Sequence, residues 1–97
     1  MTWATHHIAR LKAGETVTFK TPNGRSMIPR VNPKQVVTCA PITSPPTKGD
    51  VVLCKVGRAQ CLHLVSAVQG DRFQISNNHG HVNGWITLSG IFGKLVE

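Results

Sequence analysis

The stretch DVVLCKVGRAQCLHLVSAV, residues 50–68, decides the fold. Two runs rich in β-branched and aliphatic side chains, 50–56 and 59–68, flank the dipeptide Gly57-Arg58. Runs of this composition favour strands, and two residues are the length of a tight β-hairpin turn. The stretch therefore predicts an antiparallel hairpin at the centre of the chain.

The hairpin fixes which side chains face one another. Leu53 pairs with Leu62 and Cys54 with Cys61, because a two-residue turn sets the register. Strand side chains repeat on one face every two residues, so His63 lies on the face of Cys61. The sequence thus predicts a thiol pair and a histidine on one side of the sheet.

The remaining chain reads as short strands separated by turns. The further strands expected from alternation and β-branched content are 15–20, 35–40, 72–76, 82–87 and 91–96. Residues 5–13 fit one short helix, with Thr5 as its N-cap and Gly14 at its C-terminal end. We expect a small, mostly-β fold with a coiled or partly closed antiparallel sheet and at most one short helix. Residues 1–14 would be an N-terminal segment and 15–97 the β domain.

Length and charge limit the function classes. The chain has 97 residues, enough for one domain, and a net charge of +7 predicts weak nonspecific attraction to nucleic acid. No apolar run is long enough for a membrane anchor, and the start lacks the order of a secretory signal. Three cysteines without a C-x-x-C pair favour free thiols in a reducing compartment. We therefore expect a soluble, cytoplasmic protein.

One motif carries chemistry: Gly24-Arg25-Ser26-Met27-Ile28-Pro29. Ser26 directly follows a turn, and Pro29 has no N–H for a strand ladder and holds Ile28 extended, so Ser26 lies on a rigid corner. The pattern G-x-S-M-x-P resembles the nucleophile motif of serine peptidases of the signal peptidase and LexA-repressor type.

Two later segments fit the same resemblance, which spans residues 15–96. Gly49-Asp50-Val51-Val52 is similar to the family stretch that leads into the central strand. Leu62-His63-Leu64-Val65 falls on the strand from which the family supplies its general base, a lysine in some branches and a histidine in others. The resemblance implies Ser26 as nucleophile, His63 as base and the Ser26 N–H as one oxyanion donor. Imidazole suits the role because it is partly neutral near physiological pH.

One departure concerns the group that orients the histidine. Histidine-branch members carry G-D-N-N where this chain reads Ile75-Ser76-Asn77-Asn78, so the usual aspartate is missing. Asn77, Ser76 and Asp71 are the alternatives for this role. The residues expected to form the oxyanion site and substrate cleft are Gly24, Arg25, Ser26, Met27, Asn77 and Asn78.

The expected partner is a peptide or protein substrate, bound as an added strand beside Val17–Lys20 or Val36–Thr38. No cofactor is expected. No metal is expected either, since Cys54, Cys61 and His63 with His79 or His81 follow no established ligand spacing.

The alternative function is a catalytically decayed member of the same fold, an accessory module that binds protein or nucleic acid. By analogy, the short chain suggests a phage or mobile-element accessory protein.

Overall fold

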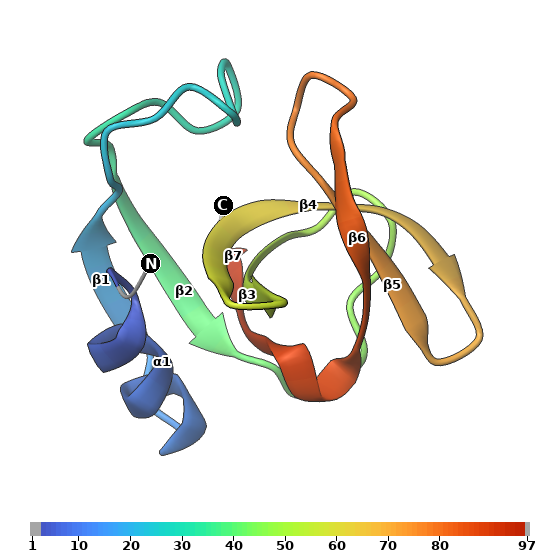
Figure 1. Ribbon diagram of the computed structural model, residues 1–97. Helices are drawn as coiled ribbons and strands as arrows, with labels where there is room; N and C mark the ends of the chain where they lie inside the picture. Colours follow the sequence, from blue (N-terminus) through green and yellow to red (C-terminus); the bar gives the residue numbers. More distant parts are fainter. Residues whose placement is uncertain (1–2, 97) are drawn as a thin grey trace.

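The computed structural model describes residues 3–96 and is mostly β, as predicted (Figure 1). The elements are one helix, α1 (Thr5–Lys12), a 3₁₀ turn (Leu88–Gly90) and seven strands: β1 (Val17–Lys20), β2 (Val36–Pro41), β3 (Val51–Val56), β4 (Ala59–Gln69), β5 (Arg72–Ser76), β6 (Val82–Thr87) and β7 (Ile91–Val96). The helix and each strand lie within or close to a range expected from the sequence, whereas the 3₁₀ turn was not predicted.

All seven strands form one antiparallel sheet in the order β1-β2-β7-β3-β4-β5-β6. The sheet is strongly coiled, so that β6 curls back toward β3 (Figure 1). The two strands approach closely enough that a Cβ on Gly84 would lie 3.2 Å from Cγ1 of Val56. This close approach makes the sheet partly closed, as predicted.

The central hairpin has the predicted register. Leu53 pairs with Leu62 and Cys54 with Cys61, and Gly57 opens the turn with a φ of 60°. On the other side of β4, pairing with β5 begins only at Leu64. The first half of β4 therefore has a strand neighbour on one side only, and this open edge is where the candidate site lies.

The sheet order also decides which edges are open to a substrate strand. β1 is an edge strand of the sheet, so the predicted docking edge at Val17–Lys20 has an open side. β2 lies between β1 and β7, and Thr38 pairs on both sides, with Thr18 and Val96. Thr38 therefore has no open side for a substrate strand, and the prediction of a docking edge over Val36–Thr38 is wrong at this residue.

The N-cap of the helix lies one residue earlier than predicted. Ala4 is the N-cap and no side chain caps the helix, so the prediction of Thr5 as N-cap is wrong. The Thr5 hydroxyl instead accepts a hydrogen bond of 2.9 Å from Nε2 of Gln60 in β4. At the other end, Gly14 follows the helix with a φ of 88°, as expected of a C-terminal glycine.

The helix packs against the sheet where Gly93 of β7 leaves room for the Leu11 side chain. Ile8 and Leu11 are its buried residues, and a Cβ on Gly93 in β7 would lie only 2.8 Å from Cδ1 of Leu11. The helix joins a core cluster with β1, β2 and one face of the hairpin. A second cluster, which includes Cys54 and Cys61, fills the inside of the coiled part of the sheet. The site lies where β4 divides these two clusters.

Candidate active site

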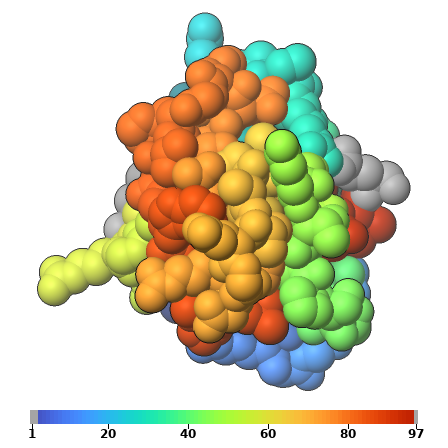
Figure 2. Space-filling view, turned by 90° about the vertical axis from the view of Figure 1, so that its right-hand side faces the viewer, coloured from blue at the N-terminus to red at the C-terminus, as the bar shows by residue number. Residues whose placement is uncertain are grey.

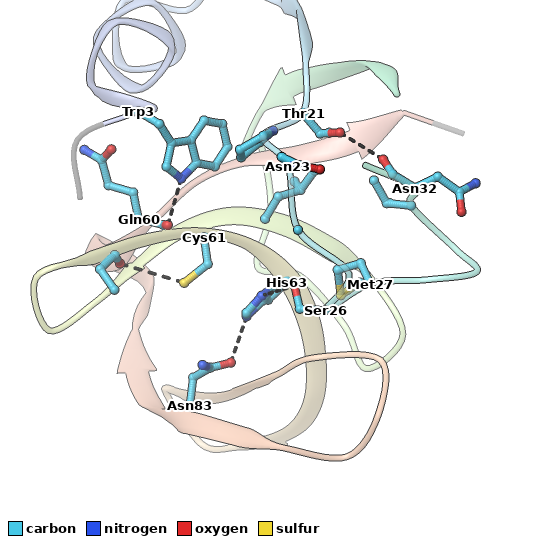
Figure 3. Close-up of a pocket in the computed structure, with 15 residues that line it drawn as sticks. Trp3, Thr21, Asn23, Ser26, Met27, Asn32, Gln60, Cys61, His63 and Asn83 are labelled. Atoms are coloured by element: carbon cyan, nitrogen blue, oxygen red, sulfur yellow. Dashed lines mark hydrogen bonds between the residues drawn. The ribbon is translucent and has the colours of Figure 1, made fainter. Parts of the chain in front are cut away.

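Ser26 and His63 are in direct contact. Ser26 lies in the turns that follow β1, and His63 lies on β4 just before pairing with β5 begins. The Oγ of Ser26 is 3.0 Å from Nε2 of His63 (Figure 3). This is hydrogen-bond distance, the geometry required of a serine and the base that takes its proton.

The other ring nitrogen of His63 has a partner on β6. Nδ1 of His63 lies 2.8 Å from Oδ1 of Asn83 (Figure 3). An amide oxygen only accepts, so Nδ1 carries the proton and Nε2 is left as the acceptor for the Ser26 hydroxyl. Ser26, His63 and Asn83 thus form one hydrogen-bonded chain in the tautomer that general-base catalysis needs.

The sequence alternatives for the orienting group did not include Asn83. Ser76 pairs with Val82 and Ile75 with Gly84, so Asn83 is the extra residue of a β-bulge between β5 and β6. Bulges redirect a side chain out of the regular alternation. Asn83 lies in the segment 77–85, which holds three Asn and two Gly, and this composition is the sequence signal that could have pointed to it.

The turn between β5 and β6 holds the segment that carries Ser26. The Asn78 N–H donates to the Ser26 carbonyl at 2.7 Å, and its side-chain amide donates to the Ile28 carbonyl at 3.1 Å. Nε2 of His79 contacts the Arg25 carbonyl at 3.0 Å. Figure 2 shows the turn, in orange, lying against the cyan to teal segment that follows β1. These bonds fix the position of Ser26 relative to His63.

The residues expected to line the cleft divide into two groups. Gly24, Ser26 and Met27 line a pocket beside the Ser26–His63 pair. Arg25, Asn77 and Asn78 do not line it. Oδ1 of Asn77 accepts from the N–H groups of His79 and His81, so Asn77 shapes the β5–β6 turn.

The pocket has a volume of about 290 Å³ and lies along the open edge of β4 (Figure 3). Its wall is completed by Trp3, whose Nε1 donates to the Gln60 carbonyl at 3.0 Å. The lining residues include no Asp, Glu, Lys or Arg; they are Trp3, Thr21, Pro22, Asn23, Gly24, Ser26, Met27, Val31, Asn32, Ala59, Gln60, Cys61, Leu62, His63 and Asn83. The pocket is therefore a mostly apolar, uncharged recess in a basic protein.

The surroundings of His63 shift its pKa in opposite directions. Burial, the largest influence, lowers the pKa, whereas contacts with Cys61 and then Asn83 raise it. The net result is a pKa of His63 above its ordinary value. His63 is consequently a stronger base than free imidazole, and its neutral form predominates only above that raised pKa.

Residues 3–96 hold no cluster of three or more His, Cys, Asp or Glu side chains that could bind a metal. Cys39, Cys54 and Cys61 are free thiols. No helix within these residues has the length and apolar character needed to cross a membrane. The site itself brings a hydroxyl, an imidazole and an amide together in one hydrogen-bonded chain.

Comparisons with protein-family models, with curated proteins and with solved structures each find no match to this chain.

Proposed function

We propose that the protein is a serine peptidase in which Ser26 attacks a peptide carbonyl, His63 is the general base and Asn83 orients His63. The observation that carries the proposal is the hydrogen-bonded chain of Ser26, His63 and Asn83, with distances of 3.0 and 2.8 Å. The motif around Ser26, which resembles that of signal peptidase and LexA-type enzymes, supports it independently.

The reaction follows from the positions of the protons. His63 takes the Ser26 proton at Nε2 as Oγ attacks, and then gives it to the leaving amine, so that an acyl-enzyme remains. The Ser26 N–H supplies one donor to the oxyanion. Water then attacks the ester with the same base. Asn83 stabilises the transient imidazolium through Oδ1, as a neutral acceptor in place of the usual carboxylate.

The pocket indicates the substrate side chain. A recess without charged lining residues, walled by Trp3, Met27, Val31 and Leu62, favours a neutral apolar side chain. A charged side chain would lose its hydration there without finding a partner. We therefore propose a substrate with an aliphatic or aromatic residue beside the cleaved bond.

The open edge of β4 offers main-chain contacts for an extended substrate. The Gln60 carbonyl points away from β3, since it accepts from Trp3. Leu62 lies two residues further along the strand, so its main-chain groups point to the same side. An extended peptide that pairs with Leu62 passes directly beside His63 and Ser26.

The proposal is tested by incubating the protein with a diverse mixture of synthetic peptides and identifying cleavage products by mass spectrometry. We expect cleavage next to neutral apolar residues, and none with Ser26→Ala or His63→Ala. Ser66→Ala is the matched control, because this serine lies on β4 but bonds to Gln74. A folded wild-type protein that cleaves no peptide contradicts the proposal.

The alternative is then a decayed module that binds protein or nucleic acid through its basic surface, which salt-dependent binding would support.

A further inference from the structure

Two thiols face each other beside the candidate active site. Cys54 on β3 and Cys61 on β4 are direct cross-strand partners, and both belong to the buried cluster inside the coiled sheet. Directly opposed residues of an antiparallel pair have Cα atoms about 4.5–5.5 Å apart, within the range that a disulfide spans. The register therefore allows these two thiols to join without moving the strands apart.

The two thiols differ in access. Cys61 is 9% exposed and lines the pocket, whereas Cys54 is completely buried. A small reagent that enters the pocket meets Cys61 first, and Cys54 lies directly behind it.

The surroundings also separate the two thiols in acidity. The contact with Cys54 lowers the pKa of Cys61; burial opposes this, and the contact with His63 lowers the pKa further, so that it lies below the ordinary value. The contact with Cys61 and burial both raise the pKa of Cys54. Of the two thiols, Cys61 therefore loses its proton more readily, and the thiolate is the reactive form.

The third cysteine is a control within the same chain. Cys39 is fully buried on β2 in the other core cluster, and burial raises its pKa to about 12. It has neither a thiol partner nor a pocket, since its strand neighbours are Val17 and Leu95. Only Cys61 thus combines a route for a reagent with a second thiol opposite.

We propose that Cys61 and Cys54 form an oxidation site for small hydroperoxides on the wall of the active-site pocket, with Cys61 as the attacking thiol and Cys54 as the resolving thiol. The Cys61 thiolate attacks one peroxide oxygen; it becomes a sulfenic acid, and the second oxygen leaves as water or alcohol after taking up a proton. The Cys54 thiol then attacks the Cys61 sulfur and releases water, which leaves a Cys54–Cys61 disulfide. Overall, two thiols are oxidised and one hydroperoxide is reduced. This chemistry needs no peptidase turnover, although Cys61 also contacts His63.

The test treats the reduced, full-length protein with hydrogen peroxide, alkylates the remaining thiols after denaturation and maps them by mass spectrometry. We expect loss of two hydrogen atoms, a Cys54–Cys61 link that dithiothreitol reverses, and Cys39 alone alkylated. With Cys61→Ala, the rate of thiol oxidation falls by at least about tenfold. Because the readout is the mass of the protein, a missing peptidase activity does not affect the result.

A second variant separates the two roles. In Cys54→Ala, oxidation of Cys61 is slower, because the contact that lowers the pKa of Cys61 is lost, and it stops at the sulfenic acid, which dimedone traps. Cys39→Ala is the matched control and leaves both the rate and the product unchanged. The proposal is overturned if Cys39 oxidises as fast as Cys61 in the folded protein, or if peroxide leaves all three thiols reduced.

Discussion

Removal of the Asn83 amide is the perturbation that tests the site geometry most specifically. Asn83→Ala deletes the acceptor that lies 2.8 Å from Nδ1 of His63. In the proposed reaction this acceptor contacts an imidazolium, and a hydrogen bond to a charged group contributes about 1.5–3 kcal/mol. The rate should therefore fall about 10- to 150-fold. Asn83→Asp should raise the pKa of His63 further and restore or exceed the wild-type rate at alkaline pH, because a carboxylate stabilises the imidazolium more strongly.

The assay is the second-order rate of labelling by a fluorophosphonate probe at pH 8, followed by intact mass. Circular dichroism checks that each variant is folded. Thr87→Ala is the matched control, since Thr87 lies on the same strand and its hydroxyl bonds only to Ser89. A folded Asn83→Ala variant that labels at the wild-type rate would refute the role of Asn83.

Two further predictions concern pH and packing. Labelling of Ser26 by the probe should be lost as pH falls through the raised pKa of His63, because the protonated ring cannot accept the Ser26 proton. The Cys61→Ala variant lacks a contact that raises the pKa of His63. The midpoint of its pH profile should therefore lie at lower pH than that of the wild type. Gly93→Ala should lower the free energy of unfolding by about 1–3 kcal/mol, since the added Cβ would lie 2.8 Å from Leu11, whereas Gly24→Ala has nothing within 4 Å and should change it little. Thermal unfolding measures both glycine variants, and equal melting temperatures would contradict the packing argument.

The parts of the fold that local sequence determines were predictable. The hairpin register follows from two apolar runs and a two-residue turn, and the pairing of Cys54 with Cys61 follows from that register. The helix end at Gly14 follows in the same way, because a residue with positive φ favours glycine. In these places the local pattern and the tertiary structure agree.

The parts that depend on distant contacts were not predictable. Ala4, not Thr5, is the N-cap of the helix, and the Thr5 hydroxyl accepts a hydrogen bond from Gln60, which lies 55 residues away in the sequence. Asn83 reaches His63 only because a bulge on β6 takes it out of the regular alternation, and no short-range pattern marks a bulge at this position. Trp3 completes the pocket through a bond to the Gln60 carbonyl, a contact that the first residues of the chain do not reveal.

The central claim is that His63 activates Ser26, and site-resolved labelling with a fluorophosphonate probe at pH 7 to 8 tests it most directly. The probe forms a bond from phosphorus to the serine oxygen and loses fluoride, so the modified residue is found by peptide mapping. The account predicts one label, on Ser26, that disappears in Ser26→Ala and in His63→Ala and persists in Ser66→Ala. A folded wild-type protein that takes up no label, or a label that persists in His63→Ala, would contradict it.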